Sequence, residues 1–242
     1  MNKVKHYIVL ILCALTLVLS VVKIGRFLHD YKAANTAYSN AARECKVPDA
    51  KELDESIFEK FDLNALTKVN DEILGWIIIP GTNISYPIAQ HGNNTYYLDH
   101  LYNKEENHVG TPFLDFQNSS DFTDFNSLII GHTTKDKSMF SELHYYQDKS
   151  FWKDHSTIYL YSKNGLSKYM IFAAYQGSPT GPSYQCNISS IDEKKAFIDY
   201  ANASSLYDTK INPDVDDQFL TLSTYVANIK KYRMIVNAVK IQ

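Results

Sequence analysis

The chain begins with an apolar segment, Tyr7 to Val22, whose only polar interruptions are Thr16 and Ser20. A membrane-spanning helix needs about 20 apolar residues, and the basic residues beside this run can reach toward water. No small-residue cleavage site follows it, so we predict an uncleaved signal anchor over residues 1–25. Basic residues flank both ends, so the positive-inside rule favours a cytoplasmic N-terminus only weakly. The size of the polar remainder separately favours an orientation with the C-terminal part outside the cell.

A helical pattern follows the anchor. Residues 26–46 carry Ala, Tyr and Leu at helical spacing without Pro or Gly, which predicts a helix leaving the membrane. Val47-Pro48 ends it, and a second helical pattern covers residues 50–66. We predict that residues 26–70 form a helical stalk or cap packed on the next domain, since the repeat is too short for a coiled-coil dimer.

At Ile73 the hydrophobic pattern changes to that of short strands separated by turns. Ile73–Ile79 is continuously apolar and stops at Pro80-Gly81, a turn signal. Short strands with few helices predict a mainly β protein with added helices, in which residues 71–242 form a closed, antiparallel-rich barrel. Asn94 is expected to cap a short helix. The other predicted strands cover residues 84–89, 110–115, 127–130, 157–162, 168–176, 218–225 and 232–241, and a helix covers 192–205.

Charge and cysteine content exclude several classes of function. The net charge of −3 and a pI near 6.2 give no basic patch, so nucleic acid is not an expected partner. Three scattered cysteines, Cys13, Cys45 and Cys186, do not form a disulfide framework. No Cys-His cluster has zinc spacing and no acidic loop has calcium spacing, so we expect no metal and no cofactor.

The predicted hairpin near the C-terminus places polar side chains on one face. Thr221, Ser223 and Tyr225 alternate along its first strand, where side chains repeat with period two. Arg233 lies near the start of the second strand, within reach of the end of the first. An arginine in a cleft binds an anion or a carbonyl, whereas an edge-strand arginine is simply solvated, and the hairpin alone does not choose between these interpretations.

A histidine ends another predicted strand. Residues 127–130 form a short, mainly apolar strand that leads into Gly131-His132. The glycine lets the chain turn and leaves His132 at the strand's end rather than inside a core. A lone histidine is more often a surface or core residue than a catalyst. Met139 and Phe140 are expected to pack beneath this strand.

Together these two stretches resemble the class B sortases. The resemblance rests on TLST at residues 221–224, on the spacing to Arg233, and on Gly-His followed by Met-Phe; LGWIIIPGT, YPIAQ and GTPFLD add to it. It implies a closed β-barrel in a single-pass membrane protein of a Gram-positive cell. It also implies a cysteine transpeptidase that cleaves the C-terminal sorting signal of surface proteins and joins them to an amine of the peptidoglycan precursor.

One position departs from the family, because Tyr225 stands where the nucleophilic cysteine is expected. The resemblance implies that His132 protonates the leaving amine and that Arg233 stabilises the oxyanion or grips the substrate backbone. A phenol has a reference pKa near ~10, and the ring fills the space of the scissile carbonyl. We therefore expect this chain to be an inactive or impaired transpeptidase. The alternative hypothesis is a non-catalytic protein that binds sorting-signal peptides or another sortase, and a structural surface module would not explain the retained histidine and arginine.

Further residues are assigned to the site by the resemblance. Ser223 lies about ~7 Å back along the strand from Tyr225 and matches a substrate-contact position, which we favour over a nucleophile role. Asn94 and Leu98 match the loop that lines the sorting-signal groove, although a helix cap and a core leucine are equally good structural interpretations. Cys186, in a loop near that groove, is the alternative nucleophile, but a loop cysteine is more often incidental.

Overall fold

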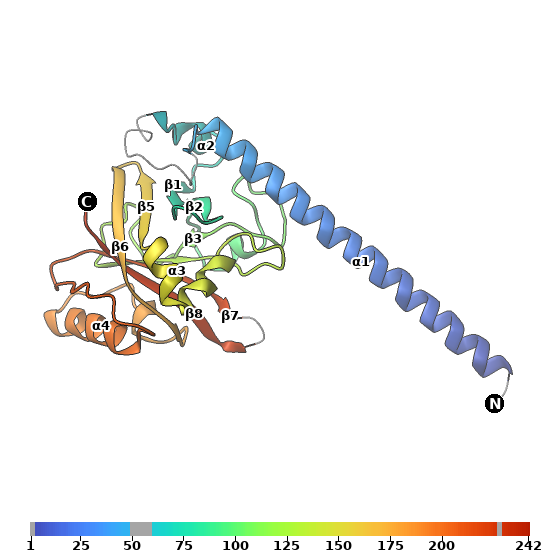
Figure 1. Ribbon diagram of the computed structural model, residues 1–242. Coiled ribbons are helices and arrows are strands. Elements are labelled where there is room, and N and C mark those ends of the chain that lie inside the picture. Colours follow the sequence, from blue (N-terminus) through green and yellow to red (C-terminus); the bar gives the residue numbers. More distant parts are fainter. Residues whose placement is uncertain (1–2, 49–59, 227–228) are drawn as a thin grey trace.

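A long helix leads into a closed β-barrel (Figure 1). The computed structural model describes residues 3–48, 60–226 and 229–242. The helices are α1 (Lys3–Glu44), α2 (Asn64–Thr67), α3 (Lys149–Asp154) and α4 (Ile191–Ser204), with the 3-10 turns η2 (Tyr96–Leu98), η3 (Ser141–Gln147) and η4 (Pro182–Tyr184). The strands are β1 (Ile73–Ile78), β2 (Ser85–Ala89), β3 (Phe113–Leu114), β4 (Asn126–Ile130), β5 (Thr157–Ser162), β6 (Gly165–Gly177), β7 (Phe219–Val226) and β8 (Ile229–Lys240).

The barrel closes in the strand order β1-β2-β3-β4-β7-β8-β6-β5. This confirms the predicted mainly β barrel, and β7 and β8 are antiparallel neighbours as the C-terminal hairpin predicts. Two neighbouring pairs, β2 with β3 and β4 with β7, are parallel. The predicted start of the second strand at residue 232 is wrong, because the ladder continues beyond a bulge after Tyr225 and pairs Val226 with Ile229, where β8 begins. Lys231 therefore lies in β8.

Strand β7 is buried on both faces from Phe219 to Thr224. Leu220 and Leu222 of β7 belong to the core inside the barrel. Phe219, on the opposite face, packs in a second cluster with Phe197 of α4. Successive strand residues face opposite sides, so β7 is buried between two hydrophobic layers from Phe219 to Thr224, although Thr221, Ser223 and Thr224 are polar. Ser190 and Glu193 form a capping box that fixes the start of α4.

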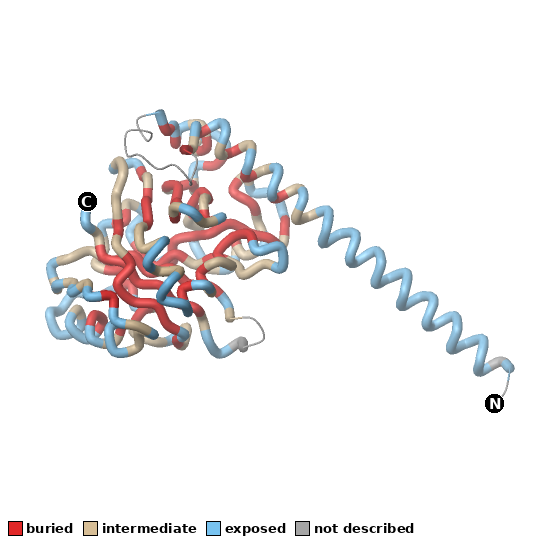
Figure 2. The backbone as a smooth tube through the Cα atoms, in the orientation of Figure 1, coloured by how far each residue is buried: buried red, intermediate tan, exposed pale blue. Residues whose placement is uncertain are grey.

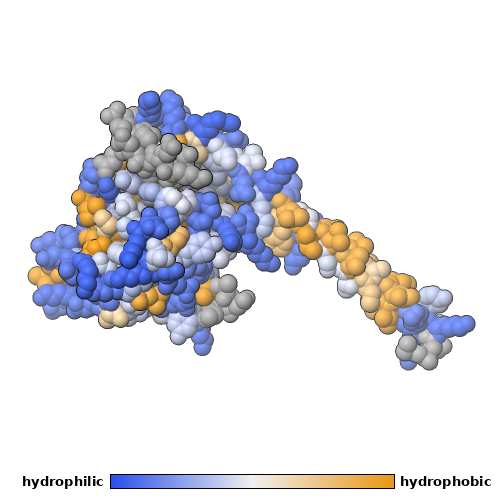
Figure 3. Space-filling model, in the orientation of Figure 1, coloured by the Kyte–Doolittle hydropathy of each residue, from blue (hydrophilic) through white to orange (hydrophobic). Residues whose placement is uncertain are grey.

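Helix α1 is one continuous helix through the predicted anchor and the first part of the predicted stalk. Gly25 does not interrupt it, since one glycine costs a helix only about 1 kcal/mol. The apolar first half projects away from the barrel and is exposed (Figures 2 and 3), and by length and composition α1 can cross a membrane. Further along, Ala34, Tyr38 and Ala41 are buried, and Tyr38 hydrogen-bonds to the barrel domain.

Most of the second predicted helix, residues 50–66, lies outside the described residues. The described end of this region contains α2, where Leu66 is buried. Phe61 also packs there, with its ring centroid 4.4 Å from that of Tyr161 on β5. These contacts hold the end of the N-terminal region against β1 and β5.

Candidate active site

Residues His132 and Ser223 come together because β4 and β7 run in parallel. The Gly131 N–H donates to the Ser223 carbonyl at 3.0 Å, so the two strands end side by side. A Cβ on Gly131 would lie 2.7 Å from the ring of Phe140, which is fully buried. Met139 is buried as well, in agreement with the prediction that this pair packs beneath the histidine. Glycine at 131 is therefore a packing requirement.

The orientation of the His132 ring is set by the backbone of η2. Its Nε2 lies 2.6 Å from the carbonyl oxygen of Leu98. A carbonyl only accepts, so Nε2 carries the proton and Nδ1 holds the lone pair of the neutral ring. Burial lowers the pKa of His132 below its usual value, and the hydrogen bond to Leu98 offsets this only in part. The imidazole is thus mainly neutral at pH 7, with its basic atom at Nδ1.

Tyr225 and Arg233 face each other across the β7–β8 ladder. The guanidinium carbon of Arg233 lies 3.7 Å from the centroid of the Tyr225 ring, a close cation–π contact. The same ring is 6.3 Å from that of His132, with 29° between the planes. Because Tyr225 is 36% exposed, the three side chains meet at the surface of the barrel. The structure therefore brings together the three residues that the family resemblance assigns to the catalytic positions.

The backbone of Tyr225 is held by a polar cluster that the sequence did not reveal. Its carbonyl oxygen accepts from Thr133 Oγ1 at 2.8 Å and from His144 Nε2 at 3.0 Å. Thr133 Oγ1 also lies 2.8 Å from Thr224 Oγ1. Two neighbouring donors on one carbonyl, 3.2 Å apart, hold the backbone at position 225 at the end of β7.

Ser223, the predicted substrate contact, is completely buried. Its hydroxyl shares a short hydrogen bond with the hydroxyl of Tyr184 in η4. Burial raises the pKa of Tyr184, which also lies within electrostatic reach of Arg233. The sequence showed only a loop rich in Ser, Pro and Gly here, and nothing in that pattern indicated that Tyr184 contacts β7. A peptide can touch Ser223 only after Tyr184 has moved.

Asn94 does not cap η2, so the capping prediction is wrong. The cap position is Thr95, and the Asn93 side chain accepts instead from the backbone N–H groups of Thr95 and Tyr96. Asn94 donates to Asp115 Oδ2 at 2.6 Å and accepts from the Phe116 N–H at 2.9 Å. It thereby ties the η2 loop to the segment after β3.

Leu98 meets the cluster through its backbone, because its carbonyl binds His132, while its side chain packs partly buried against the barrel core. Cys186, the alternative nucleophile, is buried, and burial raises the pKa of its thiol to about 12. A thiolate is the reactive form of cysteine, so Cys186 is a poor nucleophile at neutral pH. Over residues 3–48, 60–226 and 229–242, no group of three His, Cys, Asp or Glu side chains is arranged to hold a metal ion.

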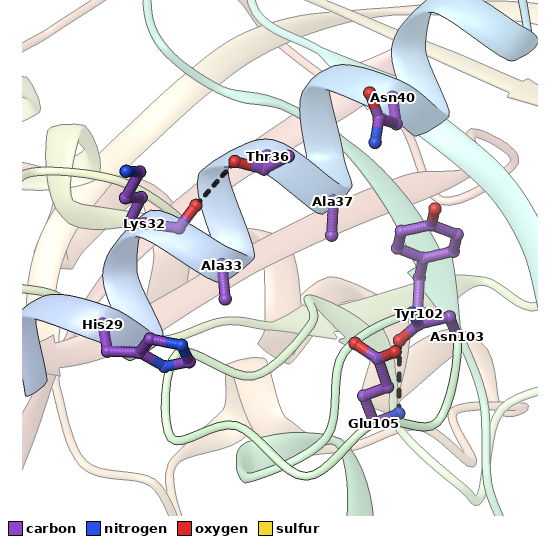
Figure 4. Close-up of a pocket in the computed structure, with 9 residues that line it drawn as sticks. All are labelled: His29, Lys32, Ala33, Thr36, Ala37, Asn40, Tyr102, Asn103 and Glu105. Carbon is purple, nitrogen blue, oxygen red and sulfur yellow. Dashed lines mark hydrogen bonds between the residues drawn. The ribbon is translucent and has the colours of Figure 1, made fainter. Parts of the chain in front are cut away.

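A separate groove of about 490 Å³ lies between α1 and the loop at residues 102–105 (Figure 4). It is lined by polar and small side chains, His29, Lys32, Ala33, Thr36, Ala37, Asn40, Tyr102, Asn103 and Glu105. None of these residues belongs to the cluster of His132, Tyr225 and Arg233. The groove therefore does not belong to the candidate active site.

Known proteins of similar sequence and structure identify the family. The sortase domain family model matches residues 77–241. Sortase B of Listeria monocytogenes is 32% identical over 204 residues, which cover 84% of this chain and 82% of that protein. The Staphylococcus aureus sortase B–substrate complex has a TM-score of 0.76 and 27% identity, covering 88% of this chain and 99% of that one. A sortase B complexed with triglycine has a TM-score of 0.76 and 26% identity, with 87% and 98% covered. The chain therefore belongs to the sortase family of cysteine transpeptidases, and within it to class B.

Proposed function

We propose that this chain is a membrane-anchored class B sortase whose groove receives the sorting signal of secreted surface proteins, and whose transpeptidation is blocked or impaired by Tyr225. The reaction of the intact site would cleave the sorting signal and join the new carboxyl end to an amine of the peptidoglycan precursor. Residues 1–25 would be the anchor, residues 26–70 the helical stalk and residues 71–242 the extracellular barrel. Family membership and the apolar first half of α1 support this proposal.

The polar side chains take the roles that their geometry permits. The neutral His132, with its lone pair at Nδ1, is suited to accept a proton from a thiol and to return it to the leaving amine. Arg233 would stabilise the oxyanion or hold the substrate backbone. Asn94, Leu98 and Ser223 would line the peptide groove, with Ser223 reached only when Tyr184 moves aside.

One observation supports impairment most strongly. The family resemblance assigns the nucleophile to position 225, where the guanidinium carbon of Arg233 lies 3.7 Å from the centroid of the Tyr225 ring. The guanidinium that should meet developing negative charge is instead stacked on an aromatic ring. A peptide carbonyl would have to displace the ring, break this contact, and would still meet no thiol.

The second candidate is a protein that binds sorting signals, or another sortase, without turnover. It is favoured by the same contact, because a stacked tyrosine and arginine offer a planar surface for a peptide backbone. The partners are suggested by relatives, one solved as a sortase B–substrate complex and one as a complex with triglycine. In both candidates the extracellular barrel would face the cell wall.

Peptide binding tests the shared part of both candidates. Fluorescence anisotropy of labelled sorting-signal peptides with the full chain in detergent should show saturable binding. Asn94→Ala should weaken it, because the η2 loop loses its ties to Asp115 and Phe116, whereas Asn164→Ala, on the exposed β5–β6 turn, should not. Absence of binding across a varied peptide library would contradict the proposal.

A further inference from the structure

The loop at residues 97–111 contacts the active-site histidine on one side. On its other side it contacts the half of α1 nearer the barrel, Phe27 to Glu44, which is the juxtamembrane half. Towards the active site, the Leu98 carbonyl accepts from His132 Nε2. A Cβ on Gly110, whose φ is +67°, would lie 2.8 Å from the Leu98 carbonyl oxygen and 3.0 Å from His132 Cδ2. The histidine ring therefore packs directly on the backbone of this loop.

The far side of the loop is bound to Asp30 and its neighbours on α1. His108 Nδ1 lies 2.9 Å from Asp30 Oδ2, and Asn107 Nδ2 donates to the Asp30 carbonyl at 3.0 Å. The rings of Phe27 and Tyr31 meet the imidazole of His108 edge to face, at centroid distances of 4.5 and 5.1 Å. His108 Nε2 is buried and has no hydrogen-bond partner within the described residues. The partly exposed side chain thus packs against α1 and is held through Nδ1.

Tyr38, further along α1, forms the second attachment. Its hydroxyl donates to the Gly110 carbonyl at 2.5 Å and lies 2.9 Å from Thr111 Oγ1. Within the loop, the Thr111 N–H donates to the Tyr97 carbonyl and the Asn107 N–H to the Asp99 carbonyl. These bonds connect the attachments on α1 to the residues on either side of Leu98.

We infer that the juxtamembrane half of α1 is a positioning element for His132, with Asp30 and Tyr38 as the positioning residues. They fix the loop at residues 97–111, and the loop fixes the ring through the Leu98 carbonyl. The helix that carries the predicted anchor thereby holds the histidine in one tautomer.

This inference gains its importance for catalysis from the proposed role of His132, but its test needs neither peptide nor turnover. The native full chain in detergent micelles, labelled with ¹⁵N-histidine, reports the tautomer of each ring through its nitrogen shifts. Loss of signals in His132→Gln assigns His132. We expect native His132 to be almost entirely the Nε2–H tautomer, as its bond to Leu98 requires.

Two substitutions on α1 should release the ring. In Tyr38→Phe and in Asp30→Asn the Nδ1–H fraction of His132 should rise about fivefold, the ratio that corresponds to one typical net hydrogen bond. Tyr146→Phe is the matched control, because it removes a buried hydroxyl that also donates to a carbonyl, that of His155 at 2.6 Å. It should lower the melting temperature as Tyr38→Phe does and leave the tautomer of His132 unchanged.

If Tyr38→Phe does not fold, Asp30→Asn, at a partly exposed position, decides the question alone. Native tautomer fractions in the folded α1 variants would overturn the inference. An equal change in Tyr146→Phe would also overturn it, since the effect would then reflect general loosening.

Discussion

The parallel strands β4 and β7 end side by side but carry different kinds of residue. At the end of β4, Gly131 and His132 match the sortase pattern, and the ring is neutral, oriented and packed. At the end of β7, the backbone of Tyr225 is held as firmly, by Thr133 and His144, yet its side chain is not a nucleophile. Under the proposed function, His132 keeps the acid–base role at the end of β4, and the departure from the family pattern lies in the side chain at position 225.

The largest effect is expected from changing that side chain. Tyr225→Cys should raise thiol-dependent cleavage of a sorting-signal peptide by roughly 10³-fold or more, because nucleophile, acid and oxyanion partner act as a unit. Chromatography of cleaved peptide measures the rate. Tyr225→Ala is the control, since it opens the groove without adding a thiol. Equal rates for these two variants would show that the ring only blocks access, and Tyr225→Cys combined with His132→Ala should lose the gain.

At the end of β4, Gly131→Ala should lower the free energy of unfolding. The new Cβ would lie 2.7 Å from the buried ring of Phe140, and overpacking of this kind costs about 1–3 kcal/mol. Urea unfolding gives the change in free energy. Gly92→Ala, where a Cβ meets nothing within 4 Å, should change stability by less than about 0.5 kcal/mol. A similar loss in both variants would mean that glycine at 131 has no particular packing role.

The two histidines near the ends of β4 and β7, His132 and His144, should make the stability of the protein sensitive to mild acid. Burial lowers the pKa of His132 and of His144. A histidine with a depressed folded-state pKa is protonated more readily in the unfolded chain, so unfolding free energy falls as pH drops below the unfolded value near ~6.5, until the folded pKa is passed. Melting temperature should fall between about pH 7.5 and about pH 5.5.

The matched variants for this acid effect are His132→Gln, His144→Gln and His29→Gln. The first two should each reduce the fall in melting temperature, because glutamine does not titrate. His29, whose side chain is 81% exposed, should leave the fall unchanged when replaced. If His132→Gln and His144→Gln both keep the pH dependence of the native chain, these two histidines are not the cause of the acid sensitivity.

The smallest effect concerns the contact between Arg233 and Tyr225. Arg233→Ala should cost about 0.5–1 kcal/mol, the usual value of an exposed cation–π pair. In a Tyr225→Ala background the same substitution should cost less, and a double-mutant cycle measured by urea unfolding gives the coupling. A coupling of zero would indicate that the ring and the guanidinium are adjacent without attraction.

The sequence predicted the barrel and the three-residue cluster for identifiable reasons. Alternation along residues 219–225 and the spacing to Arg233 are local, so the β7–β8 hairpin follows from them. The parallel pairing of β4 with β7 joins distant segments and is not visible in any local pattern. It was the family resemblance, and not periodicity, that placed His132 beside Tyr225.

Other features of the site depend on backbone groups that no sequence pattern specifies. Thr133 and His144 bind the carbonyl of Tyr225, and any residue at position 225 would present the same carbonyl. The adjacent asparagines 93 and 94 are both good caps by type, and only the fold decides which one turns towards Asp115. The attachment of Asp30 to His108 likewise needs the folded loop.

Intact-mass measurement of the native chain after incubation with a sorting-signal peptide tests the central claim most directly. A sortase nucleophile forms an acyl-enzyme, so the adduct reports the nucleophile itself. We expect the native mass to stay unchanged, while Tyr225→Cys gains the mass of the acyl fragment at residue 225. The claim is that the nucleophile belongs at position 225 and is absent from the native chain. An adduct on the native chain, mapped by digestion to Ser223, Cys186 or any other residue, would contradict it.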